Sequence, residues 1–350
     1  LCLALMLAAG IIAHHQKLSA LLAAGILLLP ATQYPATTWW SKPDLDREYV
    51  LSLDVEHYFG NIQKMRKHLE TDRQILWVTY YRNLYNATHP SEINSPVSLS
   101  RNLLAWNQPG TNGLILPVNP SASFLSILFA NELWFTLGDM TMAEHCAMLS
   151  MIFSPRNSGS RMIKRLAEIN LVNGDDEAAL KYLRILDKTL LHKSWAEKRI
   201  PGQQTPRVKE WLEKKRRDIP TQDHLRSGND AVTSLRNLVA SNAGNLRAYE
   251  YLLCYHLLSK DLRSFVEDYV PGKVSSSIFA EALLIHLARQ GNIRAEELIK
   301  YQIPVKIAKE FADYTRLYEA KDTSLKEKYG KTYWFYYHFA TTEPGKESKP

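Results

Sequence analysis

The chain has 350 residues, which is enough for two average domains or one long repeat array and for a sizeable buried core. Apolar residues make up 45% and charged residues 23%, an ordinary balance that argues against wholesale disorder. The mean hydropathy of −0.27 excludes membrane-spanning segments over most of the length, and 15 glycines with 16 prolines are few for a turn-dense β fold. The composition therefore favours long helices.

The net charge of +7 comes largely from residues 192–226, which contain ten Lys or Arg against five Asp or Glu. We interpret this stretch as a solvated helix face with its loop. Contact with anionic lipid headgroups and contact with nucleic acid are the alternatives. Nucleic acid is not favoured, because a basic balance alone is a weak signal.

The first 40 residues predict a helical hairpin in a membrane. Residues 1–13 are apolar but reach only about 20 Å as a helix, short of a hydrocarbon core of about 30 Å, so we expect the chain to begin inside a transmembrane helix. Residues 18–34 have about the minimum spanning length, and Tyr34, Trp39 and Trp40 are ring types that prefer the membrane interface. A buried hairpin in a soluble protein is the alternative.

The polar hinge between these helices is residues 14–17, whose two histidines we expect to face lipid headgroups rather than a metal. The hinge has one lysine, whereas five basic residues follow the second helix, so counting positive charges favours a cytoplasmic domain. Large domains cross membranes largely irrespective of charge, however. If the short Lys17-bearing hinge faces the cytoplasm, the large domain lies on the other side, so we expect a protein of the inner (cytoplasmic) membrane with its large domain in the periplasm.

From residue 46 onward the apolar spacing is helical. Residues 161–172 and 177–191 predict two helices around a break at Gly174-Asp175, the second with Ala179, Leu183, Leu186 and Leu190 facing inward. Such a helix pair cannot cover its apolar faces alone and needs stacked neighbours. Residues 41–342 are therefore predicted to form one helical-repeat domain, followed by a disordered tail at 343–350.

The repeats are degenerate but visible. A turn glycine is followed five residues later by a small residue at Gly138 and Ala143 and again at Gly174 and Ala179, and the two glycines are 36 residues apart. This spacing is close to the tetratricopeptide period of 34. A weaker unit surrounds Gly291 and Ala295, and two divergent helix pairs have their turns at Gly60-Asn61 and Lys260-Asp261. The predicted fold is all-α: two transmembrane helices and an α-solenoid of tetratricopeptide-like pairs.

Three segments of the chain are distinctive: RLAEINLVNGDDEAALKYLRILDKTLLHKSWAEK (165–198), YQIPVKIAKEFADYTRLYEA (301–320) and YGKTYWFYYHFA (329–340). They resemble an uncharacterised domain-of-unknown-function family of membrane proteins common in Bacteroidota. The resemblance implies a multi-span membrane region joined to a helical-repeat C-terminal domain, with further spans before residue 1. It implies no activity and no site residues.

No constellation in the sequence predicts catalytic, metal or cofactor residues. The HExxH, GxSxG and Walker-A spacings are absent, and Cys2, Cys146 and Cys254 have no zinc or disulfide spacing, which predicts buried thiols. Residues 158–160 predict a loop and the N-cap of the next helix. The sequence also favours interior or groove-edge positions for the helix histidines His145, His256 and His286.

Aromatic residues are densest at 333–339, which we expect to cap the last repeat, with a partner-docking surface as the alternative. The architecture favours a membrane-anchored scaffold that holds a protein or peptide partner in its repeat groove. An accessory or sensing domain of a membrane enzyme or transporter, with its active residues upstream, is the second hypothesis. An enzymatic role for this chain itself is not favoured.

Overall fold

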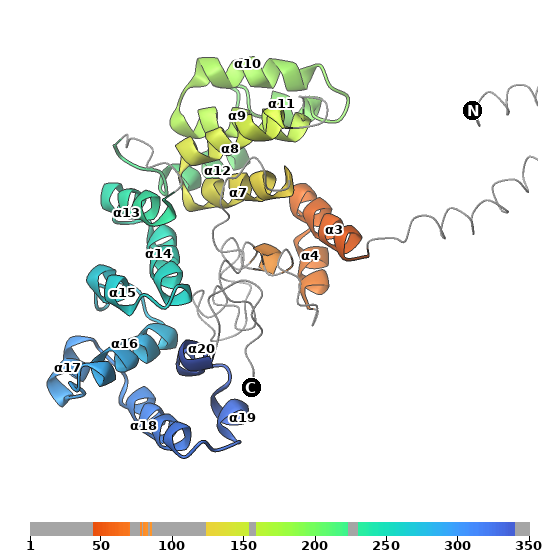
Figure 1. The fold of residues 1–350 in the computed structure, drawn as a ribbon. Coiled ribbons are helices and arrows are strands. Elements are labelled where there is room, and N and C mark those ends of the chain that lie inside the picture. Colours follow the sequence, from red (N-terminus) through yellow and green to blue (C-terminus); the bar gives the residue numbers. More distant parts are fainter. Residues whose placement is uncertain are drawn as a thin grey trace, which may run out of the picture. The chain divides into compact units, whose positions relative to one another are not determined.

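The computed structural model describes residues 45–70, 78, 80–82, 85, 124–153, 159–222 and 230–339 (Figure 1). These residues form helices joined by turns and include no β-strand, so the all-α prediction is confirmed for them. Within these ranges no helix combines the length and apolar character that a membrane span requires. The predicted hairpin at 1–40 and the tail at 343–350 lie outside the described residues.

The chain divides into two compact units, residues 1–68 and 69–350. In the first, α3 (Leu45–Phe59) meets α4 (Ile62–Leu69) at Gly60, whose φ is +70°. The Tyr49 hydroxyl donates a hydrogen bond to the carbonyl of His68 and ties the two helices together. The turn predicted at Gly60-Asn61 is therefore present.

The second unit begins with four described helices that pack in chain order: α7 (Phe124–Leu137), α8 (Met140–Ile152), α9 (Ser160–Asn173) and α10 (Asp176–Asp187). Both predicted turns have the same construction. Gly138 and Gly174 take φ of +93° and +82°, and the following Asp139 and Asp175 accept hydrogen bonds from the next helices' first turns. Ala143 and Ala179 are fully buried, as the repeat spacing predicts.

The prediction for the end of α10 is wrong. The helix stops at Asp187 and not at residue 191, and Leu190 is 97% exposed rather than inward-facing. The Thr189 hydroxyl donates to the carbonyl of Leu186 and accepts from the amide of His192, which replaces the next helical turn. The apolar spacing predicts a longer helix, but the hydrogen bonds of the Thr189 hydroxyl favour a turn at this position.

Two short helices follow, α11 (Lys193–Glu197) and α12 (Pro206–Arg216). Helix α12 packs on α9. The chain then passes so close to the first turn that a Cβ at Gly138 would lie 2.3 Å from the carbonyl oxygen of Asp218. Gly138 is thus required both by its φ and by this close approach.

The remaining helices are α13 (Ala231–Ser241), α14 (Leu246–Leu258), α15 (Leu262–Asp268), α16 (Ser277–Arg289), α17 (Ala295–Lys300), α18 (Val305–Glu319), α19 (Leu325–Tyr329) and α20 (Tyr333–Phe339). Neighbours in sequence pack together from α13 to α16, and α16 also packs against α18 and α20. The predicted turns at Lys260-Asp261 and Gly291 are present, with φ of +57° and +64°.

Helix α20 closes this end of the unit. Its Tyr333 and Tyr336 hydroxyls donate to the carbonyls of Leu257 and Leu258 at the end of α14. The Trp334 indole donates to the carbonyl of Glu281, whose carboxylate accepts from the amide of Tyr333. The three rings are buried, so the aromatic cluster serves as a cap within the chain.

Candidate functional site

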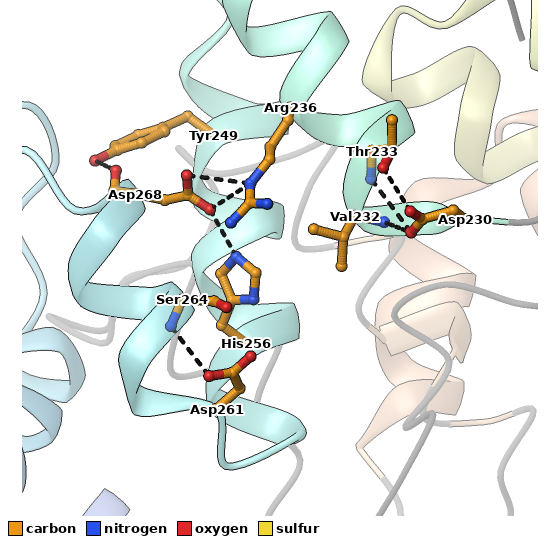
Figure 2. A network of polar contacts seen from close by, with 9 residues as sticks. All are labelled: Asp230, Val232, Thr233, Arg236, Tyr249, His256, Asp261, Ser264 and Asp268. Atoms are coloured by element: carbon orange, nitrogen blue, oxygen red, sulfur yellow. Dashed lines mark hydrogen bonds and ion pairs between the residues drawn. The ribbon is translucent and has the colours of Figure 1, made fainter. Parts of the chain in front are cut away.

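The buried histidine of α14 belongs to a polar network, which Figure 2 shows. The His256 Nε2 lies 2.8 Å from Oδ2 of Asp268, and the same oxygen accepts from Nε of Arg236 at 2.9 Å. The Tyr249 hydroxyl donates to the backbone carbonyl of Asp268 and accepts from the amide of Val270. One carboxylate therefore joins α13, α14 and α15.

This network is structural. His256 is only 2% exposed, which leaves its imidazole out of reach of a substrate, as the sequence interpretation favours. His145 and His286 are partly exposed and lie in α8 and α16. Across the described ranges, no three His, Cys, Asp or Glu side chains are grouped so that they could hold a metal ion.

A different cluster lies on one face of α9. Arg161, Lys164, Arg165 and Glu168 are spaced three and four residues apart, so they share a face of the helix, and all are partly exposed. The opposite side of α9 is buried. We call this face, together with the residues that border it from α11 and α12, the α9 stripe: Arg161, Lys164, Arg165, Glu168, Trp195, Arg199, Trp211 and Lys215.

Helix α7 supplies the carboxylate that fixes the arginines of the stripe. Glu132 has an 8% exposed side chain and bonds Arg161 through one oxygen, at 3.1 Å, and Arg165 through the other. Arg165 also pairs with Glu168 at 3.2 Å. Two guanidinium groups are thus held rigidly by nearly buried carboxylates, which limits the entropy that they would lose on binding a ligand.

Trp195 of α11 forms the second border of the stripe. The Arg199 guanidinium lies 4.0 Å and the Lys164 ammonium 5.1 Å from the centre of its indole ring. Burial lowers the pKa of both cations and outweighs the Glu168 carboxylate, which acts to raise them; the Arg165 and Arg199 charges lower the pKa of Lys164 further. The Nε atoms of Arg165 and Arg199 are buried without a hydrogen-bond partner among the described residues.

Lys215 of α12 forms the third border. Its ammonium lies 4.5 Å from the centre of the Phe135 ring, and the guanidinium of Arg165 lies 3.8 Å from the same ring. Burial, with the charges of Arg247 and Arg165, lowers the pKa of Lys215 to about 7. Trp211 stacks near Phe135, with ring centres 6.3 Å apart.

The interpretation of residues 192–226 as a solvated face therefore needs correction for its described part. Lys215 donates to the carbonyl of Phe135, and Arg216 donates to those of Leu171 and Val172. Both cations lie at the carbonyl ends of α7 and α9, where the helix dipole favours positive charge. Arg216 is nevertheless exposed, as are Lys209, Lys214 and other members of the stretch.

Residues at the start of α14 bond further carbonyls in the last turn of α7. Arg247 donates to the carbonyl of Thr136 and pairs with Asp218 at 3.2 Å. The buried Asn245 donates to the carbonyls of Leu137 and Asp218 and accepts from the amide of Ala248. These contacts fix α12 and α14 against α7, and so they fix the place of Lys215 in the stripe.

Cations outnumber carboxylates in the stripe, and two indole rings lie among them. Partly buried cations interact strongly with an added anion, because little water competes. Sequence reasoning missed this site. The available signal was the RMIKR spacing of α9 and the tryptophans placed between basic residues in SWAEKR and KEWLEKK.

The chain matches a family of unknown function, DUF6057, over residues 1–340. It belongs to that family. The resemblance to an uncharacterised family is thereby confirmed. No curated protein and no solved structure matches the chain. Membership in DUF6057 supplies no activity, so a functional proposal has to start from the side chains described above.

Proposed function

We propose that this DUF6057 chain is a membrane-anchored helical-repeat scaffold whose α9 stripe binds an acidic segment of a partner protein. One observation supports this most directly. Lys164, Arg199 and Lys215 are crowded cations, and burial together with nearby positive charges lowers the pKa of each. Carboxylates of a partner would stabilise the charged form of these groups.

The arrangement favours discrete carboxylates over a continuous phosphate backbone. Glu168 within the stripe and Glu132 next to it would repel a uniformly charged polyanion such as nucleic acid. Trp195 and Trp211 are partly exposed and offer ring surface to apolar side chains between the acidic ones. A peptide with separated Asp or Glu residues matches both features.

The proposal also includes the membrane anchor and the side of the membrane on which the repeat domain lies. Residues 1–40 would hold the chain in the inner membrane, and the repeat domain would lie in the periplasm. The helix pairs with glycine turns at Gly138 and Gly174 and buried alanines at Ala143 and Ala179 support the repeat interpretation.

A cysteine introduced at the exposed Lys309 tests on which side of the membrane the repeat domain lies. An impermeant thiol reagent should modify it in intact spheroplasts, and protection until lysis would contradict a periplasmic domain.

Peptide binding tests the proposed function. Fluorescence anisotropy of the full chain with a labelled Glu- and Asp-rich peptide should show binding that weakens with salt, and a Lys-rich peptide of equal length should not bind. Lys164→Gln should weaken binding about five- to tenfold, as for the loss of one partly desolvated ion pair. Lys181→Gln, at an exposed site on α10, is the control. Equal binding of both peptides, or an unaffected Lys164→Gln variant, would contradict the proposal.

A further inference from the structure

The turn between α10 and α11 exposes two large apolar side chains next to each other. Leu190 is 97% and Leu191 is 84% exposed, and they are the two most exposed large hydrophobic residues in the part of the chain that the structure describes. Figure 1 shows this turn at one end of the α9–α10 pair. Isolated exposed leucines are common on proteins, but an adjacent, almost fully exposed pair is not explained by packing.

Hydrogen bonds fix the conformation of this turn. Besides the two Thr189 hydroxyl bonds, the amide of Lys193 donates to the Thr189 carbonyl at 3.2 Å. The His192 Nε2 lies 3.1 Å from the Ser160 hydroxyl oxygen at the start of α9. The backbone therefore presents both leucines outward in a fixed conformation.

Basic residues flank these leucines in the sequence. From Lys181 to Lys198 the chain has five basic and two acidic residues. Lys188 and Lys193 directly flank the turn and are exposed, as is Arg184 on α10. An apolar tip with cations on either side of it in the chain is the pattern that complements an anionic bilayer, where aliphatic groups enter the acyl boundary and cations remain among phosphates.

We propose that the turn at residues 188–193 contacts the lipid bilayer, with Leu190 and Leu191 inserted at the interface and Lys188 and Lys193 on anionic headgroups. A docked protein is the less suitable occupant, because a stable protein interface needs several hundred Å² of contiguous surface. Among the described residues 176–193, which form α10 and the turn, the only other exposed large hydrophobic side chain is Ile185, at 48%. The proposal does not depend on peptide binding by the α9 stripe.

Photocrosslinking of the full chain in vesicles tests this contact. A benzophenone amino acid replaces Leu190 in one variant and Ile299 in a control, which is 76% exposed but lies beside Glu296 and Glu297 on α17. In phosphatidylcholine vesicles with phosphatidylglycerol, mass spectrometry should find lipid adducts at 190 and about tenfold fewer at 299. Removing phosphatidylglycerol, or introducing Lys188→Gln with Lys193→Gln, should reduce the adduct at 190 by a similar factor.

Three results would overturn the proposal. They are equal lipid adducts at positions 190 and 299, an adduct at 190 that is insensitive to both phosphatidylglycerol and the two lysines, and crosslinks at 190 mainly to a second copy of the chain or to another protein. Because the replaced side chains are exposed, the variants should melt at the parent temperature, and the melt confirms that folding is intact.

Discussion

The ammonium of Lys215 lies 3.3 Å from the carbonyl oxygen of Phe135, so the end of α12 caps the last turn of α7. The contact places a cation against the negative end of a helix dipole. It also places that cation near Arg165 and Arg247, and these charges together with burial lower its pKa to about 7. The capping contact is thus made by a group whose charge changes near neutral pH.

Lys215 should make stability depend on pH. Its pKa in the folded chain is about 7, whereas an unfolded lysine titrates near 10.4, so between these values the unfolded state binds more protons. The free energy of unfolding should therefore rise with pH across this range, by roughly 1–3 kcal/mol from this group after allowance for its partial exposure. Urea denaturation of the full chain at pH 7, 8, 9 and 10 measures the rise.

The Lys215→Met variant isolates this contribution, since other groups titrate equally in both proteins. It should lose the corresponding part of the rise between pH 7 and 10. Lys214→Met, at the exposed neighbouring position, should keep the parent's pH profile. A Lys215→Met profile parallel to that of the parent would show that the ammonium is not desolvated in the folded chain.

Ala179 marks the close crossing of α9 and α10. Because it is fully buried, Ala179→Leu should lower the free energy of unfolding by roughly 1–3 kcal/mol through overpacking. Ala178→Leu is the matched control, since that side chain is only partly buried and has room toward solvent. Equal thermal melts for the two variants would contradict the packing described for this crossing.

Local signals predicted the helix pairs well. Glycine followed by Asp at 138–139 and 174–175 fixes both turns, because a positive φ and an N-cap carboxylate are needed there whatever the surroundings. The prediction for the end of α10 was wrong, and the reason is also local. Leu190 continues the apolar spacing, but the Thr189 hydroxyl satisfies the backbone groups that another helical turn would use.

The α9 stripe could not be predicted from the sequence, and here the reason is not local. Glu132 and Arg165 are 33 residues apart and Lys215 and Phe135 are 80 apart, so their contacts depend on how helices stack. Composition made residues 192–226 look uniformly solvated. Only the packing of α12 on α9 brings Arg216 to the carbonyl end of α9.

Asp268 holds three helices through one carboxylate, so Asp268→Asn should destabilise the chain. The change removes the negative charge that faces Arg236 and the buried His256 while keeping the side-chain shape. We expect a loss of roughly 1–3 kcal/mol in urea denaturation, as for charge-assisted hydrogen bonds at partly buried sites. Glu213→Gln, on the exposed face of α12, should be nearly neutral. Equal stability of the two variants would mean that the network contributes little.

The two turn glycines should respond differently to the same substitution. Both have positive φ, so Gly174→Ala should cost roughly 1–2 kcal/mol from backbone strain alone, because a Cβ there meets nothing within 4 Å. Gly138→Ala adds a clash, since its Cβ would lie 2.3 Å from the Asp218 carbonyl oxygen and must displace the segment that leads from α12. We expect a loss of roughly 3 kcal/mol or more, with Lys215 and Asn245 drawn away from α7. Thermal and urea unfolding of the two variants measure the difference. Equal losses would show that the chain after α12 does not pack against the α7–α8 turn.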